Sequence, residues 1–296
     1  MFFNFLRYRH IYYLFSGLLI LGSIVALAVF GLRFGIDFNG GSVLEIEYQD
    51  SRPANQEIQD KLADLNLGEM IVQPIGDRGV MLRMRDLDED THQRVLQKLG
   101  AKEQRFESIG PVIGRELKKK TQVAIALATA AIMFYIAFAF RKVSRPVPSW
   151  QYGLIAAVVA FFHDVLIPLG AFAVLGKYVG AEINIPIIAA LLTVLGYSIQ
   201  DTVVVFDRIR ENLLRHRGVS FEDTINFSLN QTFVRSLNVS LTALLVLFAI
   251  FFFGGETLKY FSLALIIGIA SGTYSSIFLA SPLLITWQRR RQRPRG

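Results

Sequence analysis

The sequence contains 296 residues, of which 52% are hydrophobic and 24 are phenylalanine. This composition, with a mean hydropathy of +0.41, excludes an ordinary soluble domain. The absence of cysteine excludes disulfide bonds and thiolate metal sites, and the four histidines are scattered, so no metal site is predicted. The net charge of +7 would suggest nucleic-acid binding in a soluble protein, but in a membrane protein it is typical of cytoplasmic loops.

Six apolar runs are long enough to cross a bilayer, which requires about 20 residues each. The first run follows Arg7 and Arg9 and contains a sequence like a signal-peptidase site at Ala26, but it continues apolar beyond that point, which predicts a retained anchor. The sequence therefore predicts an α-helical polytopic membrane protein. The six predicted transmembrane helices cover residues 11–32, 123–140, 152–175, 185–206, 237–253 and 260–287.

Basic residues predict the orientation of these helices. Arginine and lysine are concentrated in the segments that are cytoplasmic if the first segment is inside, whereas the short outer loops contain only Lys177 and Lys259. Both termini are then expected in the cytoplasm. Residues 1–32 comprise the cytoplasmic N-terminus and the first transmembrane helix, and 289–296 form a basic cytoplasmic tail. Residues 33–122 form the one predicted extracytoplasmic domain, and 123–288 form the remaining helix bundle.

The predicted extracytoplasmic domain has a readable pattern of short elements. Residues 42–48 alternate between apolar and polar side chains, as a half-buried strand does, and 53–65 have apolar residues at helical spacing. A hairpin is predicted from two apolar stretches, 70–75 and 80–84, around a glycine-containing turn. A second helix over 88–99 and a last strand over 104–109 complete the order β-α-β-β-α-β. This order is typical of a ferredoxin-like α+β domain.

The joints between this domain and the predicted spans contain glycine and proline. Gly35, Gly40 and Gly41 can adopt positive φ, as a sharp turn out of the bilayer would require. Pro111, which follows Gly110, predicts the start of a helix that continues into the second span. Either the joints are plain connectors, or they form a hinge that transmits motion between the membrane and the domain.

Charged residues inside the predicted spans are the strongest functional signal. Asp201 lies deep in the fourth span, where an ionised carboxylate is costly, and His163 and Asp164 lie near the middle of the third. Arg235 enters the fifth span at a similar depth to Asp201, because neighbouring spans run in opposite directions. One cation and two acids are therefore predicted partners. Further polar residues at helical spacing on these spans are Thr193, Tyr197, Gln200, Ser228, Gln231, Thr232, Asn238 and Thr242.

Two interpretations of these charges stay open. They neutralise one another and fix helix packing, or they form a proton relay, for which enclosed acids beside a permanent cation are suited. An intramembrane aspartyl protease using Asp164 and Asp201 is disfavoured, because neither lies in a Gly-x-Gly-Asp motif and Arg235 would keep both ionised. The sequence also lacks a Walker A loop, so its work is not expected to be driven by its own ATP hydrolysis. No enzyme activity and no cofactor are predicted.

The sixth span contains a face of small residues. Gly268 and Gly272 have the G-x-x-x-G spacing that permits close helix contact, and Ala264, Ser271, Ser275 and Ser276 lie nearby. This face packs either within the chain or between two copies. Packing within the chain is the favoured alternative.

Several motifs together resemble the SecF family, the smaller membrane subunits of the bacterial SecD-SecF protein-export complex. The earlier ones are "GIDFNGGSVLEI" after the first span, "GPVIGREL" before the second and "HDV" at His163 in the third. The later ones are "GYSIQDTVVVFDRIREN", "SLNQTFVRSLNVSLTALLVL" and "GIASGTYSSIFLASPLL". Asp201 and Arg235 match the acid and the arginine of the family's proton pathway, while Gln200 stands where that family often has Asn.

The resemblance implies a function that residue spacing does not show. It implies a subunit of the resistance-nodulation-division superfamily in the bacterial inner membrane, which pairs with SecD, associates with the SecYEG channel and uses a proton gradient, or sodium in some members, to promote preprotein translocation. A passive scaffold is one alternative. Half of a small-molecule efflux pump is another, although pumps of that superfamily have much larger outer domains.

Overall fold

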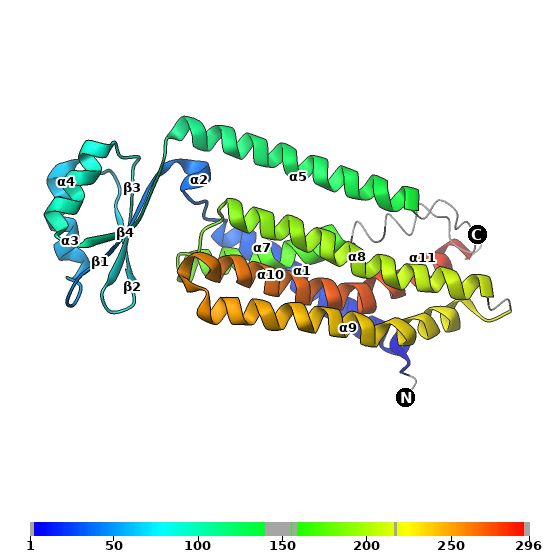
Figure 1. Cartoon of the computed structure of the whole chain (residues 1–296). Coiled ribbons are helices and arrows are strands. Elements are labelled where there is room, and N and C mark those ends of the chain that lie inside the picture. Colours follow the sequence, from blue (N-terminus) through cyan, green and yellow to red (C-terminus); the bar gives the residue numbers. More distant parts are fainter. Residues whose placement is uncertain (1–2, 140–154, 156–158, 216–217, 293–296) are drawn as a thin grey trace. The chain divides into compact units, whose positions relative to one another are not determined.

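The computed structural model describes residues 3–139, 155, 159–215 and 218–292 (Figure 1). The chain divides into two compact units, one comprising Met1–Arg33 and Ala124–Gly296, the other Phe34–Val123. The first unit is helical, and the second contains a small sheet with its own helices. Residue 140 of the second predicted span, 152–154 and 156–158 of the third, and 293–296 of the predicted tail lie outside the described residues.

Four helices in the described part of the chain are long and apolar enough to cross a membrane. They correspond to the first, fourth, fifth and sixth predicted spans, which supports the prediction of a polytopic membrane protein. The second predicted span falls within α5 (Pro111–Ala139), and the described part of the third falls in the π-helical segment η3 (Ala160–Val165) and α7 (Leu166–Tyr178). The four helices cover Phe5–Phe30, Ile185–Arg215, Phe221–Phe253 and Leu258–Arg289.

Three of these helices pack around a common core. The elements α8 (Ile185–Arg215), α9 (Phe221–Phe253) and α10 (Gly255–Ser275) contact one another, and η3 packs against α8 and α10 (Figure 1). A second π-helical segment, η4 (Ser276–Ala280), joins α10 to α11 (Ser281–Gln292). The apolar core between them includes Val205, Phe206, Ile209, Ile225, Leu229, Leu284 and Ile285, all fully buried.

Close packing of α10 on α8 depends on glycine. A Cβ atom at Gly268 would lie 2.2 Å from Val194 Cγ2, and one at Gly272 would lie 2.9 Å from Ser198 Cβ. These contacts are within the chain, and they leave room for no larger residue on this face of α10. The helix α1 (Arg9–Phe30) similarly packs on α7, where a Cβ at Gly170 would lie 2.5 Å from Ser23 Cα.

The second unit contains the predicted succession of strands and helices. Its four strands form an antiparallel sheet in the order β2-β3-β1-β4, and the core between sheet and helices includes Leu44, Ile46, Ile58, Leu82 and Val95, each at most 1% exposed. In chain order the elements are β1 (Gly41–Glu47), α3 (Asn55–Leu62), η2 (Ala63–Leu65), β2 (Ile71–Ile75), β3 (Gly79–Met84), α4 (Glu89–Leu99) and β4 (Lys102–Ile109).

The entry into this unit differs from the predicted glycine turn. Residues Ile36–Asn39 form a helical turn, α2, and only Gly40 and Gly41 have positive φ, at 76° and 129°. Gly35 has an ordinary φ of −72°, so the prediction that it needs glycine's conformational freedom is wrong. The sequence Ile-Asp-Phe-Asn gives no strong helix signal. The turn is stabilised by Phe38, which is 4% exposed, and by the Asn39 side chain, which donates to the Phe34 carbonyl at 2.8 Å.

The glycine pair also packs tightly against the start of α5. A Cβ at Gly40 would lie 2.9 Å from Pro111 Cα, and one at Gly114 would lie 2.9 Å from the Gly40 nitrogen. Pro111 is the first helical residue, as predicted, and Gly110 has no atom near its potential Cβ. At Gly40 the glycine therefore meets two needs, a positive φ and a close backbone approach.

Candidate functional site

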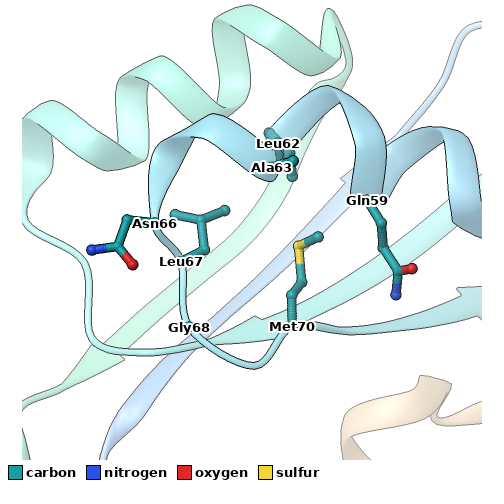
Figure 2. Close-up of a pocket in the computed structure, with 7 residues that line it drawn as sticks. All are labelled: Gln59, Leu62, Ala63, Asn66, Leu67, Gly68 and Met70. Carbon is teal, nitrogen blue, oxygen red and sulfur yellow. The ribbon is translucent and has the colours of Figure 1, made fainter.

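Two pockets in the described part of the chain differ in the residues that line them. One hollow of ≈ 340 Å³ lies beside α3 and the start of β2 (Figure 2), but its lining, which includes Gln59, Leu62, Asn66 and Met70, has no group that exchanges a proton near neutral pH. A much smaller one, ≈ 60 Å³, lies between α8 and α9 and is lined by Asp201 and Arg235. The candidate site is therefore sought in the helix bundle.

Asp164 is completely buried in the bundle, where three elements supply its hydrogen-bond donors. Its Oδ2 atom accepts from the hydroxyl of Ser198 on α8 and, at 2.8 Å, from the hydroxyl of Ser275 on α10. Its Oδ1 atom lies 2.7 Å from Nδ1 of the preceding residue, His163. Because the π-helical segment η3 carries both His163 and Asp164, the two side chains reach the same polar cluster.

His163 is only 1% exposed and has one satisfied ring nitrogen. Its Nδ1 atom contacts Asp164 and lies 3.3 Å from Ser271 Oγ, and its ring stacks on Tyr274 with centroids 5.8 Å apart. The buried Nε2 atom has no hydrogen-bond partner among the described residues. An N–H at Nδ1 that donates to the carboxylate fits these contacts.

Asp201 is half-buried and is held by hydroxyl groups from two other helices. Ser236 of α9 donates to Oδ1 at 2.6 Å, and Ser276 donates to Oδ2. Ser275 and Ser276 are consecutive residues, so the end of α10 and the start of η4 contact both acids. The structure therefore brings Asp164 and Asp201 to one helix end.

Arg235 lines the small hollow beside Asp201 but is exposed in this chain. Within the described residues it makes no ion pair with Asp201 or Asp164, so the direct pairing expected from depth alone is not observed. The physical reason is rotation about the helix axis, because neighbouring residues on a helix differ by about 100° in direction. On α9 it is Ser236, and not Arg235, that points at the carboxylate.

The other predicted residues lie around this cluster. Thr232 is buried but donates to the Ser228 carbonyl of its own helix at 3.0 Å, while Gln200 and Asn238 are exposed. Gln200 lines the same hollow as Asp201. Gly268 and Gly272 lie on the face of α10 that packs against α8.

Four serines were not singled out from the sequence as partners of the acids. They are Ser198, Ser236, Ser275 and Ser276, of which the last two were seen only as small packing residues. Spacing from an acid on the same helix would not have found them, because Ser198 lies one turn from Asp201 but donates to Asp164. A second signal, the π-helical segments at Ala160–Val165 and Ser276–Ala280, cannot be read from the sequence, although such segments are frequent at functional sites.

The donors around the two acids are neutral, which determines what the site can do. A hydroxyl group can donate to an ionised carboxylate, and it can accept from a protonated one when its own proton has a second acceptor. No group of three metal-ligating side chains occurs in the part of the chain that the structure describes. Reversible protonation is one chemistry that carboxylates in such surroundings can carry out.

These features define a polytopic membrane protein with a small α+β domain and carboxylates enclosed among its helices. Two family models match the sequence. Residues 91–290 match the C-terminal region of the protein export membrane protein SecD/SecF, and residues 25–51 match the SecD/SecF GG motif. The chain belongs to the SecD/SecF family of protein-export membrane proteins.

Individual relatives confirm the resemblance to SecF. The chain is 46% identical to protein translocase subunit SecF of Thermobaculum terrenum over 96% of its own length and 93% of that protein. It is 37% identical to the SecF subunit of Anaerolinea thermophila, with 96% and 94% covered. The crystal structure of SecDF from Thermus thermophilus, a translocon-associated membrane protein, superposes with a TM-score of 0.84 at 31% identity. That match covers 98% of this chain but only 39% of the SecDF chain.

Proposed function

We propose that the chain is the SecF-like subunit of a SecD-SecF complex that uses the proton gradient to promote preprotein translocation through the Sec channel. Family membership supports the role in protein export. The observation that carries the coupling step is Asp201, a half-buried carboxylate inside a membrane helix that is held by two serine hydroxyls. An acid in such a position is costly to keep, and one whose partners accept both charge states is suited to carry a proton.

Asp201 and Arg235 are proposed to act together without a direct ion pair. Both line the hollow of ≈ 60 Å³ between α8 and α9, which can admit water but not a larger solute. In this proposal the fixed positive charge of Arg235 lies beside the group that carries the proton, and Asp164 with His163 forms an inner part of the same polar cluster. The coupling ion is H⁺, or Na⁺ as in some members of the family, and neither a further cofactor nor an enzyme activity is involved.

The partner is proposed from the exposed polar face of α8 and α9. Gln200, Arg235 and Asn238 are exposed in this chain although they lie in membrane-spanning helices. Lipid cannot satisfy their hydrogen bonds, so another protein subunit or enclosed water must cover them. SecD is the proposed subunit, SecYEG the associated channel, and an unfolded preprotein the translocated chain.

The proposed arrangement in the membrane follows from the charge pattern. Six helices cross the bacterial inner membrane, and both termini lie in the cytoplasm. Residues 1–32 comprise the N-terminus and the first transmembrane helix, and 289–296 form the basic tail. Residues 33–122 form an extracytoplasmic ferredoxin-like domain, a topology supported by the sheet order β2-β3-β1-β4, and 123–288 form the remaining bundle. Gly35, Gly40, Gly41, Gly110 and Pro111 lie at the joints, where motion would pass between membrane and domain.

Ion flux tests the proposal most generally. The complex of this chain with SecD is reconstituted in vesicles with a pH-sensitive dye inside, and an imposed proton gradient is followed with and without an unfolded polypeptide. Proton entry that needs the complex and increases with the polypeptide is expected. Sodium-dependent flux without proton entry would identify Na⁺ as the coupling ion. If neither ion enters, the proposal that ion flow is coupled to preprotein translocation is contradicted.

Co-expression tests the partner. The chain purified with SecD is expected to resist thermal aggregation in detergent better than the chain alone, because the polar face of α8 and α9 is then covered. An unrelated membrane protein in place of SecD is the control. Equal stability in all three preparations would contradict an obligate pair.

A further inference from the structure

We propose that Ser275 and Ser276 act as positioning residues that satisfy Asp164 and Asp201 in both protonation states. Each serine hydroxyl would donate to the ionised carboxylate and accept from the protonated one. This inference rests on the proposed function, because it takes Asp201 as a group that gains and loses a proton during transport. The inference names the residues that would hydrogen-bond each acid in its ionised form and in its protonated form.

The evidence is that each of these hydroxyls has two acceptors within reach. Ser275 Oγ lies 2.8 Å from Asp164 Oδ2 and 3.1 Å from the Gly272 carbonyl oxygen. Ser276 Oγ contacts Asp201 Oδ2 and lies 3.0 Å from the Thr273 carbonyl oxygen. A serine hydroxyl has a single proton and two acceptor sites, so it can donate to only one of the two oxygens at a time.

The two choices correspond to the two charge states of the acid. When the carboxylate is ionised, the hydroxyl donates to it in a charge-assisted hydrogen bond. When the carboxylate takes up a proton, the new O–H donates to Oγ, and the hydroxyl proton turns to the backbone carbonyl three residues earlier. One O–H bond forms on the carboxyl group, no other covalent bond changes, and the heavy atoms keep their contacts.

The other serines at the acids differ in this respect. Among the described contacts, the hydroxyls of Ser198 and Ser236 bond only to the carboxylates. They stabilise the ionised form by donation, and the hydrogen bonds described for them include no second acceptor that could receive their proton after reversal. Removing Ser236 should therefore affect mainly the ionised form of Asp201, whereas removing Ser276 should affect the protonated form as well.

The position of the serine pair in the fold supports this role. Ser276 is the first residue of η4, so the pair lies where the helix changes from α to π geometry. Gly272 permits the close approach of Ser198, which brings the α8 donor and the α10 donor to the same oxygen of Asp164. The titratable and charged groups that face the cluster are Tyr197 on α8, Arg235 on α9, Tyr274 on α10 and His163 on η3.

Infrared difference spectroscopy on the reconstituted complex tests the inference, because it distinguishes the carbonyl band of a protonated Asp from the bands of a carboxylate. Acidification is expected to produce a carbonyl band that is missing in Asp201→Asn. Ser276→Ala should shift that band, since the protonated acid loses its acceptor, and gradient-dependent export should fall about tenfold, the factor that corresponds to ~1.4 kcal/mol. Ser276→Thr retains a hydroxyl and should restore both.

Two serines serve as controls. Ser236→Ala should change the carboxylate bands and leave the carbonyl band in place. Ser262→Ala should change neither, because the buried Ser262 hydroxyl, also on α10, bonds only to the Leu258 and Lys259 carbonyls of its own helix. If Ser276→Ala does not accumulate, Ser276→Cys keeps a side chain of similar size but a weak hydrogen-bonding group, and the same shift is expected.

The outcomes separate this inference from the proposed function. If Asp201→Asn leaves the carbonyl band in place, Asp201 is not the group that is protonated, and both fail. If Asp201→Asn removes the band but Ser276→Ala leaves its frequency unchanged, the proposed function stands and the two-way role of Ser276 is wrong.

Discussion

The α+β domain and the helix bundle are stabilised in different ways. The domain has an apolar core in which Leu44, Ile58 and Leu82 are fully buried, and its ion pairs, such as Lys98 with Asp64, lie at the surface. The bundle buries serines and a carboxylate, and its helices approach closely at Gly268 and Gly272. The domain therefore depends mainly on apolar volume, whereas the bundle combines an apolar core with close backbone contacts and with hydrogen bonds between residues that are distant in the sequence.

The largest stability effect is expected in the domain core. Leu82→Ala should lower the free energy of unfolding of the domain by ~2–5 kcal/mol, because it leaves a cavity beside Leu44 and Val80. Hydrogen exchange of the full chain in detergent can measure this in domain peptides and bundle peptides separately. Ile71→Ala, at a side chain that is 46% exposed, is the matched control. Equal loss of protection in the bundle would show that the two units do not unfold separately.

A glycine substitution tests the bundle in the opposite way, by adding volume. Gly268→Ala should destabilise the packing of α10 on α8 by ~1–3 kcal/mol, because its Cβ would clash with Val194. Gly22→Ala is the control, since no atom lies within 4 Å of its potential Cβ. Thermal aggregation of the two variants in detergent should differ clearly. If Gly268→Ala and Gly22→Ala aggregate at the same temperature, close packing at Gly268 does not stabilise the bundle.

The same difference explains what the sequence could predict. Alternating apolar residues predicted the strands of the domain, and apolar residues at helical spacing predicted its helices. These predictions were possible because the burial of each residue there follows from its position in its own strand or helix. Asp164, Asp201 and His163 were found because charged residues are conspicuous in apolar runs. Ser198 and Ser236 were missed because their role depends on which helices are neighbours and how each is rotated, and one helix's sequence contains neither fact. The same rotation places Arg235 beside Asp201 without an ion pair.

A small pH effect is expected at the surface of the domain. Hydrogen bonds from Thr91, chiefly its side chain and then its backbone N–H, lower the pKa of Asp88, the N-cap of α4. Because the folded pKa is depressed, the stabilisation is present above the unfolded value of about 3.9 and is lost as the pH falls through the folded value. Asp88→Asn keeps a capping side chain but removes the titratable group. The free energy of unfolding of the domain should therefore depend less on pH below about pH 4. Asp90→Asn is the control, and an unchanged slope in Asp88→Asn would contradict the assignment.

The central claim is that Asp201 is in the membrane because its charge must change there. Asp201→Asn keeps the shape and the hydrogen bonds of the side chain but removes the titratable proton, and a proton crossing 100 mV supplies ~2.3 kcal/mol. Asp207→Asn is the matched control, because Asp207 lies on the same helix with 67% of its side chain exposed.

The most direct measurement is preprotein export into vesicles that contain the complex with SecD, driven either by ATP alone or by ATP with an imposed proton gradient. Asp201→Asn is expected to assemble at normal abundance, to keep the ATP-driven export and to lose the additional export that the gradient supplies, while Asp207→Asn behaves as the unsubstituted complex. Normal gradient-dependent export by Asp201→Asn, with abundance and SecD binding unchanged, would contradict the account and leave Asp201 as a helix-packing residue.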